Sequence, residues 1–562
     1  MKNTPTPSRL AASSSARRLA ALGAALGLSF GCAHAADITW NPGLEADGGN
    51  ASWANGLNWS GGTAPADDLT SDIAVFNGTS AYNFQPTLDA FTVRSVNGLQ
   101  LGGASAVAVT IGANSGSQST SGNVTTGSTV ITMADVTGLA VGQHITGTRI
   151  PAGTFVTAVD AVNNTVTISR PTSGGTLNSA TALTFNSALR VGAAGVTLQS
   201  DTPAVANIIS APLVLGANQS WTNETTNRAL QVQGSIYLDN HTLTLAGAEG
   251  STIRLDGPQG GGAGTRQSIG GSGGLIIDTL GTVIFGEDNN NRMVNTFTGG
   301  VTLNNGTIQL QGGNAGGSGN VAGHLGTGVL TINGGRITGS GNIATHPLSV
   351  SGQVWNANWE FGGSRSVNMG TGAITLGDAA GTSRTLFVNA GSQVLTLGGG
   401  ISDGLTANSF IKAGTSELLL NGATTITGDT IVEEGTLTFG QPGSLTIYVG
   451  ENGVNNQLSG LGTLNFNGTL IFDLSLAAAT AGNSWTVIDA LLLNNTSFAA
   501  TFTVQAFSET APDSGIWTFG DYTFSEATGI LSYSAIPEPS SYAALVGVGA
   551  LGLTAFRRRR SR

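Results

Sequence analysis

A short phrase recurs along this chain from about residue 187: a few alternating apolar and polar residues, then Gly or Asn-Gly. Leu, Ile and Val occupy every second position, and Thr, Asn and Gln lie between them. This period of two is typical of a β-strand with one buried face. Clear examples are "HTLTLAGAEGSTIRLDG" (241–257), "GVTLNNGTIQLQGG" (300–313) and "GTLNFNGTLIFDLSL" (462–476).

Strands of about five residues with dense turns are compatible with a β-sandwich or with a β-solenoid. Many near-identical short strands without long connections favour the solenoid, in which each coil buries its apolar face by stacking on the next coil. Gly accounts for 85 of the 562 residues, and Gly and Asn supply the positive φ angles that tight turns need. The prediction is an all-β fold in which residues 187–534 form a parallel β-helix.

Two segments of this region, residues 295–310 and 409–440, resemble the autotransporter-associated β-strand repeat. The second departs from the repeat at Ile426, where an aromatic residue usually precedes Thr-Gly. The resemblance implies a right-handed β-helix like that of an autotransporter passenger. The matching positions are the Lys-x-Gly of Lys412 and Gly414, the Leu-rich strand 418–420, the turns Asn421-Gly422 and Thr427-Gly428, and the Gly-Thr-Leu strand 435–437.

Two segments before the repeats differ from them in character. Residues 36–117 are predicted to form an N-terminal β cap with the first strands. Residues 118–186 have longer strands and resemble a small all-β module that recurs in bacterial surface and phage tail proteins, here inserted before the solenoid. Trp40, Trp53 and Trp59 allow two interpretations, stacking on sugar rings or covering the open end of the solenoid. We favour the cap, because solenoid ends otherwise expose apolar surface and an unpaired strand edge.

The charge of the chain argues against a nucleic-acid partner. Leaving aside the basic clusters at the two ends and Glu538, the chain has 12 basic and 31 acidic side chains, a net charge of −19. Phosphate binding needs a cationic face, which such a body does not offer.

Residues 1–35 have the pattern of a secretory signal peptide: arginines, an apolar run, and the small residues Ala33 and Ala35 that signal peptidase reads. Cleavage is expected after Ala35, with cleavage after Ala36 as the alternative. Lipoprotein processing at Cys32 is the alternative, and Ser29 disfavours it by standing where Leu, Val or Ile is expected. Because Cys32 is the only cysteine, the mature chain is expected to contain no disulfide, thiolate nucleophile or Cys-based metal site.

The sequence contains no recognisable catalytic, metal-binding or cofactor-binding motif, and we therefore expect no catalytic residue, no metal and no cofactor. None of the five histidines has ligand spacing, and no nucleophile-elbow sequence is present. The Gly-rich segment 260–274 lacks the Gly-Lys-Ser/Thr of a phosphate loop. Two acidic groups offer the oxygen atoms that Ca²⁺ prefers, but neither has EF-hand spacing, so solvated loops are the better interpretation. These groups are Asp67, Asp68 and Asp72, and the pair Glu287 and Asp288.

The C-terminus, residues 535–562, contains Pro537, Glu538 and Pro539, then 17 mostly apolar residues (540–556), then an arginine cluster. As a helix the apolar run is roughly 25 Å long, at the short limit for one transmembrane span. The positive-inside rule would keep the arginines cytoplasmic. This order resembles the PEP-CTERM sorting signal, and the resemblance implies recognition by an exosortase-type membrane enzyme and cleavage near the tripeptide. The arginines that would act as the membrane stop are Arg557, Arg558, Arg559 and Arg560.

Together these patterns predict an exported, non-enzymatic structural or adhesion-type protein of the cell surface or extracellular matrix in a Gram-negative bacterium. The alternative is a β-helix polysaccharide lyase or hydrolase acting on exopolysaccharide. The expected partners are signal peptidase, the exosortase-type enzyme and, transiently, the inner membrane. Exopolysaccharide or surface glycans are further candidates.

Overall fold

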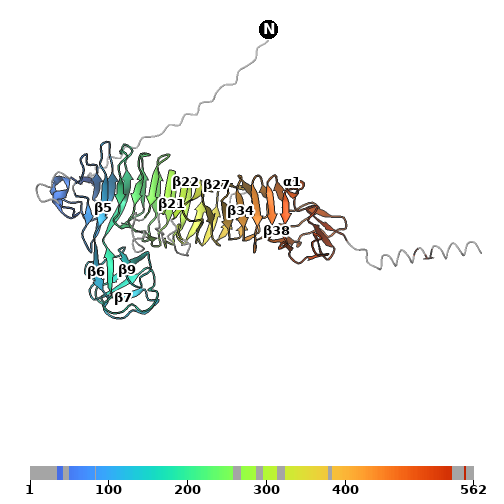
Figure 1. Cartoon of the computed structure of the whole chain (residues 1–562), viewed down its shortest axis with the longest axis horizontal. Coiled ribbons are helices and arrows are strands. Elements are labelled where there is room, and N and C mark those ends of the chain that lie inside the picture. The colour runs from blue at the N-terminus through green and yellow to red at the C-terminus, as the bar shows by residue number, and fades with distance from the viewer. Residues whose placement is uncertain are drawn as a thin grey trace, which may run out of the picture. The chain divides into compact units, whose positions relative to one another are not determined.

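The computed structural model describes residues 35–41, 50–82, 84–256, 268–286, 295–312, 323–377, 383–404, 406–534, 548 and 550–551. Met1–His34 and Ala35–Arg562 form separate units, and the following description concerns the second. Its fold is all-β, as predicted, and parallel pairing dominates. Figure 1 shows the strands of successive coils lying side by side from β5 to β38.

Most strands belong to a parallel β-helix in which the chain visits three strand positions in turn. The first position forms one continuous parallel ladder. Its strands are β1 (Ala36–Thr39), β2 (Asp72–Phe76), β4 (Val93–Leu101), β12 (Ala188–Leu198), β15 (Gln219–Asn223), β18 (Leu243–Gly247), β21 (Leu275–Phe285), β22 (Val301–Gly312), β23 (Val329–Ile332), β26 (Gly352–Trp355), β29 (Ala373–Thr375), β32 (Ile401–Ser402), β35 (Ala423–Thr424), β38 (Ser444–Tyr448), β41 (Thr469–Asp473) and β44 (Thr503–Val504).

The second position forms another parallel ladder, to which the long strands β21 and β22 contribute their second halves. Its other strands are β3 (Thr87–Leu88), β5 (Val109–Ala113), β13 (Asn207–Ile209), β16 (Leu230–Val232), β19 (Thr252–Leu255), β24 (Arg336–Gly341), β27 (Trp359–Gly363), β30 (Ser383–Asn389), β33 (Ser409–Ala413), β36 (Thr430–Val432) and β39 (Leu458–Gly460).

The third position begins with the first halves of β4 and β12 and later becomes a separate seven-stranded sheet. Its early strands are β14 (Leu213–Leu215), β17 (Ile236–Tyr237) and β20 (Ile269–Gly270). The seven-stranded sheet comprises β25 (Thr345–Pro347), β28 (Ser366–Asn368), β31 (Val394–Leu397), β34 (Glu417–Leu420), β37 (Thr436–Phe439), β40 (Thr463–Phe466) and β43 (Thr496–Phe498).

The core is built from the alternation seen in the sequence. Leu395, Leu418, Leu437 and Leu464 are partners in register on four successive coils, and all four are fully buried. Each such leucine contributes roughly 1.5–3 kcal/mol through burial of its side chain. The polar residues between them point outward. The apolar residues therefore form one inward face on each coil, and stacking of the coils removes that face from water. The predicted right-handedness of the helix stays a prediction.

A separate antiparallel sheet, in the order β6-β11-β8-β9-β10-β7, interrupts the β-helix between β5 and β12 and has its own apolar core. The strands on both sides of it already lie in the coil ladders, since β4 pairs with β12 and β5 with β13. The β-helix therefore starts before residue 187, and the inserted sheet splits it. The strands are β6 (Ser115–Ser119), β7 (Val130–Thr132), β8 (His144–Thr146), β9 (Thr154–Asp160), β10 (Thr165–Ile168) and β11 (Ala182–Asn186).

The last part of the predicted β-helix is also different, because it forms a five-stranded antiparallel sheet in the order β42-β48-β47-β46-β45. Trp485, Phe524 and Leu531 are buried in the main core, so this sheet continues the core of the coils. Hairpins with Gly in the turn have the same alternating sequence pattern as coils with Gly at the corners, so the pattern alone did not separate them. The elements are β42 (Ser484–Thr486), α1 (Ala490–Leu493), β45 (Ser508–Glu509), β46 (Ile516–Phe519), β47 (Tyr522–Ser525) and β48 (Ile530–Tyr533).

Two short 3₁₀ helices, η2 (Gly56–Asn58) and η3 (Ser60–Gly62), lie near the first coil. Within the described part of the chain no helix has the length and apolar character needed to cross a membrane. The predicted span at residues 540–556 lies almost entirely outside that part.

Candidate functional site

The residues predicted to direct export lie mostly outside the described part of the chain. This holds for Ala33, for Pro537, Glu538 and Pro539, and for the arginines at 557–560. Ala35 is the first described residue and is half-buried directly before β1. The geometry of the sorting signal is therefore not part of the site described here, which is a cavity in the folded body.

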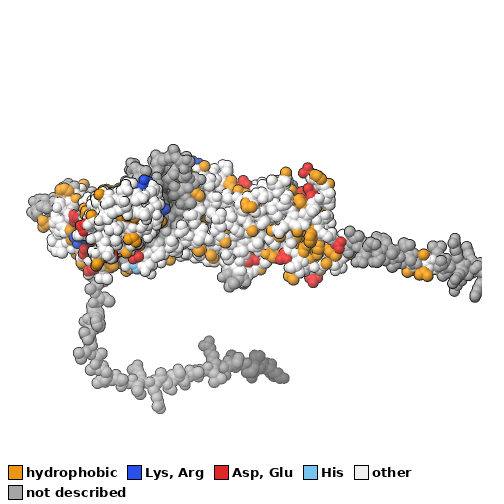
Figure 2. All heavy atoms as spheres, turned by 90° about the horizontal axis from the view of Figure 1, so that it is seen from below, with side chains coloured by type: hydrophobic (Ala, Val, Ile, Leu, Met, Phe, Trp, Pro, Cys, Tyr) orange, Lys and Arg blue, Asp and Glu red, His pale blue; other side chains and the backbone are white. Residues whose placement is uncertain are grey.

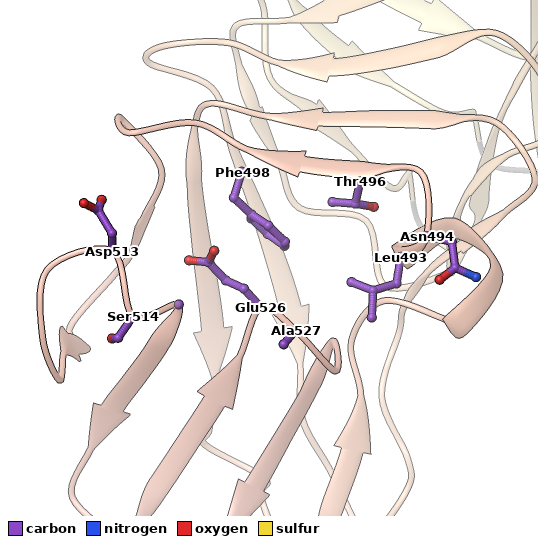
Figure 3. Close-up of a pocket in the computed structure, with 9 residues that line it drawn as sticks. Leu493, Asn494, Thr496, Phe498, Asp513, Ser514, Glu526 and Ala527 are labelled. Atoms are coloured by element: carbon purple, nitrogen blue, oxygen red, sulfur yellow. The ribbon is translucent and has the colours of Figure 1, made fainter.

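A cavity of about 440 Å³ lies where the C-terminal antiparallel sheet meets the end of the last coil. One wall comes from α1 and β43, and the other from the loop before β46 and the turn between β47 and β48. Figure 3 shows Glu526, which belongs to the second wall, beside Phe498 of the first. The lining residues are Leu493, Asn494, Thr496, Phe498, Asp513, Ser514, Gly515, Glu526 and Ala527.

Glu526 is held in place by an indole. Its Oε1 atom accepts a hydrogen bond of 2.7 Å from Nε1 of Trp517, whose ring packs edge-on against Phe502. Burial raises the pKa of the Glu526 carboxyl above its ordinary value, and the nearby negative charge of Glu509 raises it further, while the Trp517 hydrogen bond acts in the opposite direction. Glu526 thus combines a fixed orientation with a raised pKa, as a proton donor or a hydrogen-bonding group requires.

The loop opposite Glu526 is fixed by a second carboxylate. Oε1 of Glu509 accepts a hydrogen bond of 2.9 Å from the backbone N–H of Gly515, and Asp513 adopts a left-handed backbone with φ of 57°. The Ser514 hydroxyl lies 3.1 Å from the Thr510 hydroxyl. The charged lining residues are Asp513 and Glu526, both acidic. The cavity therefore suits a neutral or cationic ligand that carries hydroxyl or amine groups, and it disfavours an anionic sugar.

A second cavity, of about 410 Å³, lies on the flank of the last coils. Val454 and Leu476, which are 59% and 82% exposed, form its apolar part. The Tyr448 hydroxyl at its edge donates to the backbone oxygen of Thr425 over 3.2 Å, so that group is already engaged. Other polar residues of its lining are likewise engaged, since Asp429 accepts from the backbone of Gln457 and Asn456 donates to the backbone oxygen of Ile426.

Trp40, Trp53 and Trp59 form one buried cluster near the start of the β-helix, and their exposed fractions are 2%, 2% and 0%. The Trp59 ring makes edge contacts with both other indoles at 4.9 Å between centroids, and its Nε1 donates to the backbone oxygen of Trp53. Stacking on a sugar needs an open ring face, which none of the three has. Of the two interpretations, only the packing role fits this geometry.

The acidic loop considered for Ca²⁺ has its carboxylates engaged within the protein. Asp67 bonds Arg94 and the backbone N–H of Ser95, and Asp72 accepts from Ala66. Asp68 accepts three hydrogen bonds from Ser71 and the backbone of Thr70, which lower its pKa to about 2. The carboxylates thus stabilise this loop and join it to β4. The other candidates, Glu287 and Asp288, and most of the Gly-rich segment 260–274 lie outside the described residues.

Across the described ranges no three His, Cys, Asp or Glu side chains come together as a metal site. His144 is buried beside Phe155, where burial lowers its pKa to about 4. His324 and His346 lie next to each other inside the coils, at 5.3 Å between ring centroids. Their separation of 22 residues is close to one coil, and the repeat length was the only sequence signal that pointed to this contact.

Three comparisons with known proteins bear on these observations. Residues 535–560 match the PEP-CTERM protein-sorting motif. This motif implies export by an exosortase to the cell envelope or surface, in agreement with the resemblance at the C-terminus. The autotransporter-associated repeat has no corresponding match to support it. No curated protein matches the chain.

Among solved structures, the Gp54 tailspike of Acinetobacter baumannii bacteriophage AP22, in complex with A. baumannii capsular saccharide, is similar to this chain. The similarity covers 72% of this chain and 78% of the tailspike chain, at 9% identity and a TM-score of 0.22. At that TM-score the likeness carries no argument about the fold or the ligand of this chain.

Sequence reasoning missed the C-terminal cavity. Its lining comes from four segments between Leu493 and Ala527 that the antiparallel sheet brings together, and they share no spacing along the chain. The one local signal is the hairpin pairing of Trp517 with Phe524, which sets Trp517 beside the turn that carries Glu526. The proximity of Trp517 and Glu526 can be predicted only if β46 and β47 are known to be antiparallel.

Proposed function

We propose that this protein is an exported structural or adhesion-type component of the cell envelope or extracellular matrix, with the β-helix as its stalk. The sorting motif at residues 535–560 in a chain whose body is a stacked parallel β-helix carries the proposal. The body is right-handed and carries autotransporter-associated repeats, of which residues 409–440 supply five of the coil strands. Surface glycans or exopolysaccharide are its binding partners, and it does not act as an enzyme.

The surface of the coils supports a structural role. On the face seen in Figure 2, uncharged side chains cover most of the body, with scattered apolar groups and few basic ones. Lys412, the one lysine outside the leader, is fully buried. An enzyme acting on an acidic polysaccharide would need a groove of clustered basic and acidic residues, since substrate charge must be matched.

Export proceeds in two steps in this proposal. Signal peptidase cleaves after Ala35, and residues 540–556 then hold the chain briefly in the inner membrane of a Gram-negative cell with the arginines 557–560 on the cytoplasmic side. This orientation presents Pro537, Glu538 and Pro539 on the outer face of that membrane, where an exosortase-type enzyme reads them and the chain is released.

Intact mass and C-terminal sequencing of the protein from its native cells test the sorting step. We expect the mature chain to begin at Ala36 and to end near Pro539, and we expect a Glu538→Ala variant to stay in the membrane fraction at full length. A wild-type mature chain that still contains residues 540–562 would contradict the proposal.

The second candidate function is a polysaccharide hydrolase or lyase. The observation that favours it is the orientation and raised pKa of Glu526 in the C-terminal cavity. A general acid of a glycosidase needs a carboxyl whose pKa is raised in this way. The sign of the cavity's charge points to neutral or amino-sugar polymers as the substrate in that case.

Turnover assays separate the two functions. Purified protein is incubated with neutral and acidic polysaccharides, with Glu526→Gln as the active-site variant and Glu451→Gln as an exposed control. The structural proposal expects no reducing-end release by any of the three. Release by the wild type and the control that is lost only in Glu526→Gln would establish the enzyme.

A further inference from the structure

His324 and His346 are buried in the interior of two neighbouring coils. His346 lies in β25, and its partner on the next coil is the buried Val367. His324 precedes β23 and packs against His346 with an interplanar angle of 74°. The two imidazoles are 5% and 0% exposed. Their polar atoms need partners inside the protein, because water does not reach them.

Backbone carbonyl groups fix the protonation of both rings. Nε2 of His324 lies 3.2 Å from the backbone oxygen of Gln311, and Nε2 of His346 lies 2.7 Å from the backbone oxygen of Ser340. A carbonyl oxygen only accepts hydrogen bonds, so each Nε2 carries the hydrogen. In a neutral imidazole the other nitrogen, Nδ1, then has a free lone pair. This is the form in which histidine binds metal ions.

Three acceptor atoms of these residues have no hydrogen-bond partner among the described residues: Nδ1 of His324, Nδ1 of His346, and Oε1 of Gln311, whose backbone oxygen is the partner of His324 Nε2. Gln311 is 6% exposed. A buried polar atom without a partner destabilises a protein by about 1–3 kcal/mol, so two such nitrogens on imidazoles that pack together call for a bound group.

We propose that His324, His346 and Gln311 form a buried binding site for one first-row transition-metal ion, such as Cu²⁺, Ni²⁺ or Zn²⁺. The spacing of the rings fits this ion class. With metal–nitrogen distances of about 2.0–2.1 Å, two imidazoles on one tetrahedral ion have centroids about 5.2 Å apart. The observed distance is 5.3 Å. Two imidazole nitrogens select ions of this class over Ca²⁺ and Mg²⁺, which prefer oxygen ligands.

The affinity should be moderate. The three donors are neutral, and the positive charge of Arg365 near His346 opposes a cation. Binding should therefore be weaker than at a zinc site built from cysteine thiolates. The ion joins β22 to β25 across neighbouring coils, so we expect it to raise the thermal stability of the body.

Metal titration of the untagged full chain tests the site. We expect one equivalent of Cu²⁺ to bind, with electron paramagnetic resonance showing two nitrogen ligands, and no binding of Ca²⁺. His324→Gln and His346→Gln should each weaken binding by at least about tenfold, since even outer-shell partners change affinity by 10- to 100-fold. His144→Gln and His241→Gln, which alter histidines outside the site, should bind like the wild type.

A site filled only by water gives no stoichiometric binding, and that result overturns the proposal. Binding that survives in both site variants, or a spectrum without nitrogen ligands, overturns it as well. Circular dichroism shows whether each site variant folds. If either does not, the electron paramagnetic resonance spectrum of the wild type with Cu²⁺ decides whether two nitrogen ligands are present.

Discussion

At the scale of single residues, Lys412 is the least expected member of the core. It lies in β33, is fully buried, and its amine donates hydrogen bonds to the backbone oxygens of Gly414 and Glu434. Burial lowers the pKa of its amine from 10.5 to about 8. The Lys-x-Gly of the sequence thus has a structural reason, since the amine bonds to Gly414 of the same motif and ties it to the next coil.

This pKa predicts that stability rises with pH above 8. Between pH 8 and about 10 the unfolded chain keeps the Lys412 proton while the folded chain loses it, so protons favour unfolding. The slope is at most about 1.4 kcal/mol per pH unit. Urea unfolding at pH 7.5, 8.5 and 9.5 measures it.

The matched variant is Lys412→Met, which keeps the length of the side chain and removes the titrating group. Its stability should not rise over this range. A wild-type stability that is flat or falls between pH 8 and 9.5 would show that the Lys412 amine titrates as it does in water.

A second single residue, Trp59, holds the N-terminal aromatic cluster together, because its ring contacts every other member. Trp59→Ala removes contacts with Trp40, Trp53 and Phe76 and should destabilise the protein by about 3–5 kcal/mol. Leu57→Ala, at a position that is 41% exposed, is the control and should change stability little. Equal denaturation midpoints for the two variants would argue against a packing role for the cluster.

At the scale of elements, the inserted sheet leaves and re-enters the coil at one point. The chain leaves the coil at Asn114 and returns at Ser187, whose backbone N–H donates to the backbone oxygen of Asn114 over 3.0 Å. Sheet and coil touch through two apolar contacts: Phe155 packs near Val214 and Tyr237, and Phe91, between β3 and β4, packs against the core of the sheet. The insertion point is therefore closed by a hydrogen bond whether or not the sheet is present.

Deleting residues 115–186 and joining Asn114 to Ser187 through one glycine should leave the β-helix folded. The strands on either side keep their coil partners, because β4–β12 and β5–β13 pairing does not involve the sheet. We expect a β-type circular dichroism spectrum and a cooperative thermal transition. Tyr237→Ser in the deletion limits aggregation through the newly exposed cluster. Loss of the cooperative transition in both forms would mean that the sheet is needed for folding.

The sequence predicted the elements better than their connections. Alternation identified strands such as those around Leu418 and Leu437, because their inward residues are apolar in every coil. It did not separate coil corners from hairpin turns, so the antiparallel end around Trp485 was placed in the β-helix. The contacts that build the cavity at Glu526 and the His324–His346 pair depend on which strands become neighbours, and no local pattern encodes that.

At the scale of the whole molecule, the body depends on backbone ladders and apolar stacking. Cys32 is the only cysteine and lies before the first described residue, and the described residues contain few ion pairs. Salt therefore has few attractive pairs to screen, while it does screen the repulsion within a body whose net charge is −19, so stability should rise with ionic strength rather than fall. The thermal midpoint in 0.5 M NaCl should equal or exceed that in 0.05 M NaCl, and a lower midpoint at high salt would reveal attractive ion pairs that the described residues do not supply.

Because Lys412 is buried, cleavage at this residue can report the separation of neighbouring coils. A lysine-specific protease has one target in the body, and that target is closed as long as coils 409–440 remain stacked. Cleavage there yields two fragments of known mass, and its rate measures how often the coils separate. Opening of the coils in the purified protein can thus be measured without a label, from the appearance of these two fragments.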